Sequence, residues 1–322
     1  MKAAVSDRYG PPETVRLAEL PRPEPRRGEI LVRVAAAGIT TGDARLRGLD
    51  VPAGFGPVVR LMVGLTRPRR PVFGAEFAGR VEALGPGAAG VAIGDRVFGT
   101  TGLAGGAHAE FLTIRADGLV LPTPGTLSDV EAAAFLFGGL TAADFLIDKA
   151  GLGRGERLLV NGATGAVGTA ALQVARHLGA RVTAVCSAAN ADLARELGAE
   201  AVIDYAAGPI SGEWDVILDV IGTLPWSKAR RLLAPGGRLL PVTASFAETL
   251  GAALRPRREG RRIAGGAVGE TRGAMERLVG LHRAGAFRPV IGATFPLERI
   301  VEAHRLASSR RKRGNAVVLM PG

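Results

Sequence analysis

The pattern of apolar and polar residues changes twice along the chain. Up to about residue 126, short apolar runs rich in β-branched residues alternate with Gly and Pro. Turn signals every ~10 residues predict a partly antiparallel, barrel-like β domain. The runs expected to form its strands are residues 29–39, 76–85, 95–100 and 109–114.

From about residue 127 to residue 265, apolar strands alternate with amphipathic helices. Alternation at this length predicts right-handed βαβ units, and therefore an α/β domain with a doubly wound parallel sheet. The expected strands are residues 157–162, 181–187, 201–205, 215–222 and 238–243. The expected helices are residues 166–179, 191–198 and 226–233. The tail is expected to form helices at 270–284 and 297–308, separated by a loop, and a strand at 315–320.

The composition narrows the class of protein. The 322 residues suit about two domains, and 47% hydrophobic with 22% charged residues excludes intrinsic disorder. The single cysteine, Cys186, excludes a disulfide framework and a zinc site built on several thiolates. No apolar run reaches the ~18–20 residues of a membrane span, and the N-terminus lacks the apolar core of a signal peptide. We therefore expect a cytoplasmic protein.

The net charge of +11 is unusual, with 41 Lys and Arg against 30 Asp and Glu. Such a field attracts nucleic acid, anionic membranes or anionic small molecules. The arginines are spread along the chain, however, and aromatic residues make up only 5%. Nucleic-acid recognition usually adds a docking motif or stacking aromatics to the charge. Solvated surface arginine is therefore favoured over a polyanion site, and a phosphorylated cofactor is the simplest anionic partner.

The most informative segment is NGATGAVG, residues 161–168, which lies between an expected strand and an expected helix. Its glycines follow a G-x-x-G-x-x-G spacing, which permits a tight turn and a close approach of a pyrophosphate to backbone N–H groups and a helix N-terminus. A purely structural turn is the alternative. The βαβ pattern downstream favours dinucleotide binding by Gly162, Ala163, Thr164, Gly165, Ala166, Val167 and Gly168.

The end of the second strand of this domain bears on which dinucleotide binds. NAD sites usually place Asp or Glu there for the ribose hydroxyls. Here the strand ends without a carboxylate before Asp192, and Ser187 and Asn190 are available as donors. These donors suit a 2′-phosphate, although both residues could instead cap the next helix. The pattern favours NADPH over NADH.

Long segments throughout the chain match the motifs of one family in the right order. They include GDARLRG (42–48), RPRRPVFGAEFAGRVEALG (67–85), GDRVFG (94–99), GAHAEF (106–111), GLTA (139–142), NGATGAVG, APGGR (234–238) and FRPVIGATFPLERIVEAHRLASSRRKRGNAVVL (287–319). The chain resembles the medium-chain dehydrogenase/reductase superfamily, and within it the zinc-free quinone oxidoreductase-like branch. The resemblance implies a GroES-like β-barrel catalytic domain (1–126), a Rossmann-type NAD(P)-binding domain (127–265), and a C-terminal segment (266–322) that completes the catalytic domain. It also implies a homodimer with a small-molecule substrate and no membrane partner.

The zinc ligands of this superfamily are missing from the chain. Thr40 stands where zinc members have a cysteine, and Ala75 stands where they have a histidine. The four-cysteine structural site has no counterpart, and the four histidines are scattered along the sequence. No metal is therefore expected. Without a Lewis acid, an activated alkene or quinone is a better hydride acceptor than a simple carbonyl, because the charge spreads to a distant oxygen.

The resemblance also implies roles for particular residues. Thr40 and Asp43 would line the vacated metal position as catalytic residues, with ordinary turn chemistry as the alternative. The segment after Asp43 contains no tyrosine, so proton donation by a tyrosine would require Tyr9 to fold over the site; the only other tyrosine is Tyr205. Thr141 would contact the nicotinamide end of the cofactor, or else cap a helix. The remaining candidates for cofactor binding are Tyr205 near the adenosine, Val220, Ile221 and Gly222 at the carboxyl edge of the sheet, and Asn315 in the closing strand.

The sequence thus predicts an NADPH-dependent reductase of quinones or α,β-unsaturated carbonyls. Two other enzymes of the same fold stay open, namely an alcohol dehydrogenase and an enoyl-thioester reductase. A non-catalytic relative that binds NADPH or RNA is the third alternative, and the positive charge would suit it.

Overall fold

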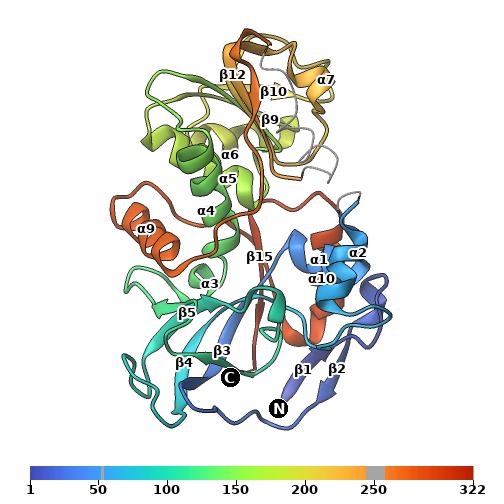
Figure 1. The fold of residues 1–322 in the computed structure, drawn as a ribbon, viewed down its shortest axis with the longest axis vertical. Coiled ribbons are helices and arrows are strands. Elements are labelled where there is room, and N and C mark those ends of the chain that lie inside the picture. The colour runs from blue at the N-terminus through green and yellow to red at the C-terminus, as the bar shows by residue number, and fades with distance from the viewer. Residues whose placement is uncertain (52–53, 244–257, 322) are drawn as a thin grey trace.

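The computed structural model describes residues 1–51, 54–243 and 258–321. Two sheets lie one above the other along the long axis of the molecule (Figure 1). The lower sheet has seven strands in the order β14-β15-β3-β4-β5-β7, with β6 paired to β3. Its strands are β3 (Glu29–Ile39), β4 (Glu76–Leu84), β5 (Arg96–Thr100), β6 (Phe111–Arg115), β7 (Val120–Pro122), β14 (Ile291–Pro296) and β15 (Asn315–Leu319). A hairpin of β1 (Lys2–Val5) and β2 (Arg16–Glu19) flanks it.

The upper sheet is parallel throughout, in the order β10-β9-β8-β11-β12-β13. Renumbered along the chain this order is 3-2-1-4-5-6, so the switch point lies between the first and fourth strands, β8 and β11. The central strands are apolar on both faces because helices cover both sides. The strands are β8 (Arg157–Asn161), β9 (Arg181–Cys186), β10 (Ala201–Asp204), β11 (Trp214–Asp219), β12 (Leu233–Pro241) and β13 (Arg262–Ile263).

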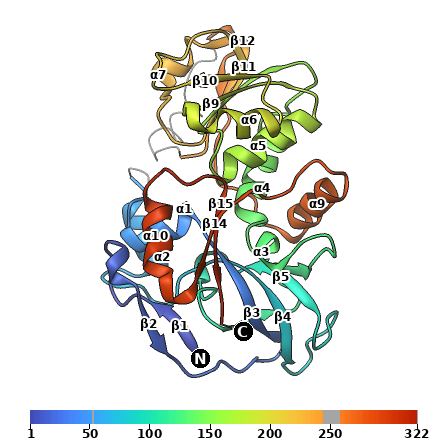
Figure 2. The same cartoon turned by 180° about the vertical axis from the view of Figure 1, so that it is seen from behind.

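The two halves are joined by helices and by the returning C-terminal segment. Helix α4 packs on α5, and β15 runs back from the upper half to pair with β3 (Figures 1 and 2). Both termini lie at the end of the molecule away from the parallel sheet (Figure 1). The helices are α1 (Thr41–Gly48), α2 (Gly56–Val63), α3 (Asp129–Ala132), α4 (Leu136–Ala143), α5 (Ala166–His177), α6 (Ala191–Glu196), α7 (Trp226–Ala229), α9 (Arg272–Arg283) and α10 (Ile300–Ser308).

The predicted fold class is confirmed, with local differences. The helix expected at 226–233 is short: α7 ends at Ala229, because Leu233 already pairs with Trp214 at the start of β12. The segment expected to be a loop before α10 contains β14, which pairs with β15 in parallel. The residues of β14 alternate between half-buried and exposed positions. The segment therefore has no fully buried apolar run of the kind that predicts a strand from sequence.

Candidate functional site: a dinucleotide cleft

A cleft of 1070 Å³ lies between the glycine loop of the parallel sheet and α1 of the lower half. The carboxyl ends of β8, β9 and β11 contribute to its upper wall, and residues 310–313 of the C-terminal segment contribute to its side. This is the edge of an open α/β sheet at which ligands bind. Eleven of the seventeen predicted site residues line the cleft: Thr141, Gly162, Thr164, Gly165, Ala166, Val167, Ser187, Asn190, Tyr205, Val220 and Ile221.

The three glycines of the loop serve different purposes. Gly162 has a φ of +86°, which favours glycine, and it turns the chain directly after β8. Gly168 lies where α5 packs against the loop: a Cβ there would come 2.2 Å from the carbonyl oxygen of Gly162. At Gly165 a Cβ would meet only that same oxygen, at 3.9 Å, so this position opens toward the cleft. Ala163 is fully buried and donates its N–H to the Val185 carbonyl at 3.1 Å.

The N-terminus of α5 faces the cleft. Gly165 occupies the N-cap position with no side-chain cap, and Ala166 and Val167 follow as the first helical residues. The N–H groups of a helix's first turn have no partner within the helix, and the helix dipole adds positive potential there. An uncapped N-terminus after a glycine turn fits a pyrophosphate.

Asn190 and Ser187 form a polar group beside the loop. The Asn190 side chain donates to the Thr164 hydroxyl at 3.3 Å and to the Ser187 hydroxyl at 3.2 Å. Ser187 and Asn190 stand at the N-cap positions of residues 188–190 and of α6, as the capping alternative expects, but neither side chain makes a capping hydrogen bond. Asp192, the nearest carboxylate along the chain, is exposed and pairs with Arg195 at 3.0 Å. The lining residues Thr164, Ser187 and Asn190 therefore offer hydrogen bonds without a carboxylate among them.

A buried network that the sequence analysis missed holds the turn after β11. The Asp219 carboxylate accepts from the backbone N–H groups of Gly222 at 3.0 Å and Leu224 at 2.8 Å. It also accepts from the side chain of Asn161 at 2.8 Å. Val220 and Ile221 thereby project along the cleft, whereas Gly222 shapes the turn with a φ of +79° and does not line it. The sequence feature that could have revealed this network is a carboxylate, Asp219, at the end of an apolar strand.

Other predicted residues are placed as follows. Thr141 lines the cleft from inside α4, and its hydroxyl donates to the Phe137 carbonyl at 2.6 Å, so it is not an N-cap. Tyr205 lines the cleft and is 63% exposed. Asn315 is buried away from the cleft, and its side chain donates to the Val290 carbonyl at 3.1 Å. Tyr9 donates its hydroxyl to the Gly64 carbonyl at 2.8 Å.

Thr40 and Asp43 are buried together and do not line the cleft, although Thr41 and Gly42 do. Thr40 caps α1: its hydroxyl accepts from the Asp43 N–H at 3.1 Å, and the Asp43 carboxylate accepts from the Thr40 N–H at 2.8 Å. The Thr40 hydroxyl also lies 2.6 Å from that carboxylate, as a donor. These hydrogen bonds fix the N-terminus of α1. They also occupy the Thr40 hydroxyl as a donor to the buried Asp43 carboxylate.

The residues at the expected metal position do not fit a zinc ion. Thr40 offers a hydroxyl in place of a thiolate, and Ala75 offers no ligand atom. The neighbouring Glu76 is buried, and burial raises its pKa to about 8. One of its oxygens accepts from the Phe137 N–H, and the other has no partner among the described residues. In the described ranges no cluster of three His, Cys, Asp or Glu side chains could hold a metal.

Two of the four histidines, scattered in sequence, meet in the core of the lower half. The rings of His108 and His304 are edge to face, with centroids 5.6 Å apart. His108 also contacts the Gly38 carbonyl at 3.0 Å through Nε2. Burial, and then the neighbouring His108, lower the pKa of His304 well below its usual range, so this histidine is neutral. The packed rings of His108 and His304 are therefore part of the core.

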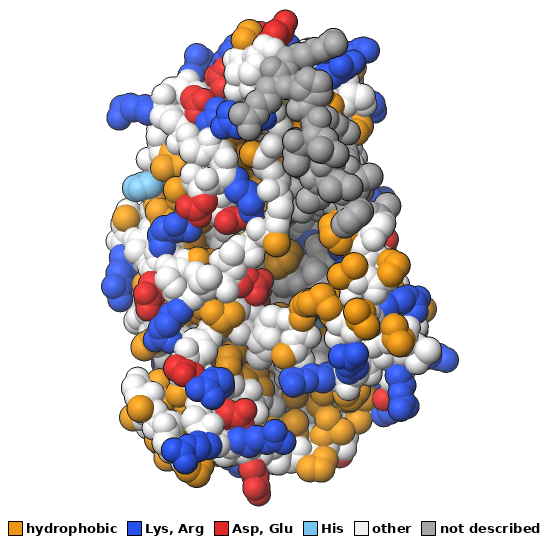
Figure 3. Space-filling view, viewed as in Figure 1, with side chains coloured by type: hydrophobic (Ala, Val, Ile, Leu, Met, Phe, Trp, Pro, Cys, Tyr) orange, Lys and Arg blue, Asp and Glu red, His pale blue; other side chains and the backbone are white. Residues whose placement is uncertain are grey.

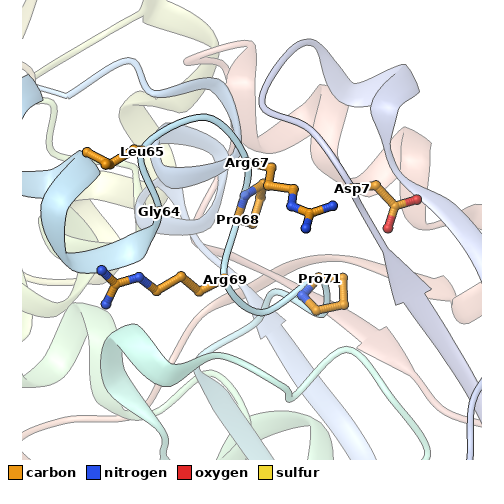
Figure 4. Close-up of a pocket in the computed structure, with 7 residues that line it drawn as sticks. All are labelled: Asp7, Gly64, Leu65, Arg67, Pro68, Arg69 and Pro71. Atoms are coloured by element: carbon orange, nitrogen blue, oxygen red, sulfur yellow. The ribbon is translucent and has the colours of Figure 1, made fainter.

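A second hollow, of 510 Å³, lies elsewhere on the lower half (Figure 4). None of the predicted site residues lines it; its walls are Asp7, Gly64, Leu65, Arg67, Pro68, Arg69 and Pro71. Basic side chains on the face shown in Figure 3 are scattered over both halves and do not form one stripe. The 1070 Å³ cleft, which gathers eleven of the predicted site residues, is therefore the candidate functional site.

A parallel sheet of this strand order, with a glycine loop and an uncapped helix at its switch point, defines a dinucleotide-binding fold. Two family models match: "Alcohol dehydrogenase GroES-like domain" over residues 26–125 and "Zinc-binding dehydrogenase" over residues 197–318. Quinone oxidoreductase from Rattus norvegicus is 28% identical over 340 residues, covering 99% of this chain and 98% of the relative.

Two solved structures extend the comparison. Quinone oxidoreductase from Coxiella burnetii has a TM-score of 0.87 at 28% identity, covering 100% of this chain and 99% of that one. The mycobacterial protein Rv1454c, solved with NADPH, has a TM-score of 0.81 at 27% identity, covering 99% of both chains. The chain also matches polyketide synthases, spanning 14% of the length of one from Streptomyces orinoci and 10% of one from Mycobacterium tuberculosis.

The chain belongs to the medium-chain dehydrogenase/reductase superfamily, in its quinone oxidoreductase-like branch. The relatives it matches include quinone oxidoreductases, and the solved Rv1454c structure contains NADPH. Within the described residues, no helix is both long enough and apolar enough to cross a membrane.

Proposed function

We propose that the chain transfers a hydride from NADPH to a quinone or an α,β-unsaturated carbonyl, without zinc, in the 1070 Å³ cleft. One observation carries this proposal: the dinucleotide loop faces a catalytic half whose metal-ligand positions hold Thr40 and Ala75. In this proposal residues 1–126 and 266–322 form the catalytic domain and residues 127–265 the nucleotide-binding domain.

The cofactor supplies the hydride, and the chain positions it. The first turn of α5 and the backbone of Gly162 and Gly165 would hold the pyrophosphate. Ser187 and Asn190 would hold the adenosine ribose and its 2′-phosphate, because their hydrogen-bonding groups face a wall without a carboxylate. Thr141 would lie at the nicotinamide end, where α4 lines the cleft. Positioning of this kind supplies much of the lowering of the barrier without a metal.

An enoyl thioester is the second candidate substrate, and one feature of the cleft favours it. Five arginines line the cleft, and phosphate-bearing acyl carriers are anionic. The matches to polyketide synthases are consistent with such a carrier. The arginines are Arg45, Arg47, Arg310, Arg311 and Arg313.

A substrate panel tests the proposed function. NADPH consumption is measured with quinones, enones, enoyl thioesters, aldehydes and saturated alcohols, with and without a chelator, and zinc is quantified by elemental analysis. We expect turnover of quinones or enones, well under one zinc per chain, and no effect of the chelator. Rapid oxidation of saturated alcohols with no reaction of enones and quinones would replace the proposal by an alcohol dehydrogenase. Binding of RNA that NADPH does not reverse, without turnover, would replace it by a binding protein.

The Ser187→Asp variant is expected to invert the cofactor preference. The wild-type wall has donors and no negative charge, so NADPH should bind more tightly than NADH. An aspartate there repels the 2′-phosphate and accepts from ribose hydroxyls. Dissociation constants for both cofactors, with Ser187→Ala as the control for the lost hydroxyl, give the measurement. Tighter binding of NADH by the wild type would contradict the assignment.

The proposal includes a cytoplasmic homodimer. The single cysteine fits a reducing compartment, and the family resemblance implies the dimer. Light scattering of the purified chain measures the oligomeric state.

A further inference from the structure

We propose that Lys312 is a catalytic residue of this chain: its ammonium group hydrogen-bonds the carbonyl oxygen of the substrate at the end of the cleft where the zinc ligands are missing. This inference rests on the proposed function and adds the group that receives the negative charge. Neither Thr40 nor Tyr9 takes that role in the structure, because the hydroxyl of each donates elsewhere.

The position of Lys312 is fixed by one hydrogen bond. The side chain lines the cleft, and its Nζ donates to the Ile39 carbonyl at 3.1 Å. Ile39 is the last residue of β3 and directly precedes Thr40, the N-cap of α1. The ammonium therefore lies on the catalytic side of the cleft, near Thr41 and Gly42, which line the same wall.

Lys312 keeps donors free for a ligand. An ammonium has three N–H donors, and among the described residues only the bond to Ile39 uses one. No carboxylate within the described ranges lies within salt-bridge distance of it. The remaining donors face a half-buried environment, in which a hydrogen bond from a charged group is stronger than in water.

Buried carboxyl groups set the charge around Lys312. Asp43 on α1 and Glu76 on β4 face it, and Glu270 in turn faces Glu76. Burial lowers the pKa of Lys312 from its usual value, and the carboxyl groups of Glu76 and Asp43 oppose that lowering. The carboxyl groups of Asp43 and Glu76 therefore favour the charged form of Lys312 that the proposal requires.

The segment that carries Lys312 also contacts the glycine loop. The N–H of Gly314, two residues on, donates to the Thr164 carbonyl at 2.8 Å. Arg311 and Arg313 flank Lys312, and both are exposed, whereas Lys312 turns inward to β3. One short segment thus links the dinucleotide loop to the catalytic side of the cleft.

The proposed reaction gives such a cation a role. When a conjugated carbonyl gains a hydride at its β-carbon, the C=C bond becomes a single C–C bond and its electron pair moves through the conjugated system onto the carbonyl oxygen. NADPH is oxidised in the same step, and one proton completes the reduction. A donor held at that oxygen stabilises the developing charge. The ammonium can then pass a proton to the oxygen and regain one from solvent.

The first test uses the chain without cofactor. 4-Nitrophenolate mimics an enolate, and its absorbance reports on the phenolate oxygen. We expect the wild type to bind it and to lower its apparent pKa, and Lys312→Met to bind it at least tenfold more weakly. Lys312→Arg should restore binding, because it keeps the charge. Lys228→Met, the same substitution at an exposed lysine on α7 outside the cleft, is the matched control.

The second test is kinetic. In Lys312→Met we expect kcat/KM for an enone to fall on the order of tenfold to a hundredfold, while the NADPH dissociation constant and the melting temperature change little. Because burial lowers the pKa of Lys312, we expect the wild type to lose activity at high pH as the ammonium loses its proton. Lys312→Arg should not show this loss, because guanidinium does not titrate there.

The outcomes separate the two proposals. Wild-type activity that Lys312→Met retains, with unchanged phenolate binding, would overturn the role of Lys312 and leave the proposed function standing. Phenolate binding that depends on Lys312, in a chain that reduces no quinone or enone, would support the anion site and overturn the proposed function. If Lys312→Met does not fold, the comparison of Lys312→Arg with the wild type in both assays decides.

Discussion

Replacing Gly165 with leucine is expected to abolish binding of the dinucleotide and to leave the fold intact. The backbone at Gly165 has a φ of −80°, which leucine adopts, and a Cβ there has no contact closer than 3.9 Å. The longer side chain would cover the uncapped N–H groups of α5 that the pyrophosphate needs. NADPH affinity should fall by a factor on the order of a hundred or more, measured by fluorescence titration with circular dichroism as the check on folding.

Gly168→Ala is the contrasting variant, because a smaller change in the same loop is expected to disturb the fold as well as the binding. Its Cβ would lie 2.2 Å from the Gly162 carbonyl oxygen and 2.5 Å from the carbonyl carbon of Ala163. Helix α5 must then move, and we expect a lower melting temperature as well as weaker binding. Normal NADPH affinity in Gly165→Leu would show that the cofactor does not approach the helix there.

The second large effect concerns stability and pH. Glu76 is buried with a pKa of about 8, whereas an ordinary glutamate titrates near 4.5. Above pH 4.5 the unfolded chain loses this proton and the folded chain keeps it, so folding becomes less favourable as the pH rises toward 8. The contribution is about 1.4 kcal/mol per pH unit within that window, and it is absent below it.

Glu76→Gln removes this titration and keeps an oxygen that can accept from the Phe137 N–H. We expect the stability of the variant relative to the wild type to increase steadily from pH 5 to pH 8 and then to level off. Urea denaturation at several pH values measures the difference in the free energy of unfolding. The contributions of the other titrating groups are the same in both proteins and cancel in this difference. A difference that stays constant with pH would show that Glu76 ionises normally in the folded chain.

The elements that could be predicted from sequence are those with a local signal. The glycine loop could be predicted from its spacing, because the turn and the close packing that require its glycines all lie within eight residues of sequence. The strands of the parallel sheet could be predicted from their apolar runs. The cap formed by Thr40 and Asp43 is also local, since three residues separate them. The sequence could not choose between capping and catalysis there, because both use the same side chains.

Features that depend on distant contacts could not be read from sequence. Asn190 turns away from its own helix because the Thr164 hydroxyl, 26 residues earlier, accepts from it. Lys312 is one of four consecutive basic residues, and nothing in the sequence separates it from its neighbours. What singles it out in the structure is its hydrogen bond to the Ile39 carbonyl, 273 residues away. The pairing of His108 with His304 likewise requires the C-terminal helix to return to the lower sheet.

The hydrogen bond from Gly314 to Thr164, with the bridge between Gly165 and Gly314, crosses from the C-terminal segment to the glycine loop. This contact ties the segment that carries Lys312 to the loop that begins α5, so two parts of the cleft wall that lie far apart in the sequence are held together by main-chain atoms.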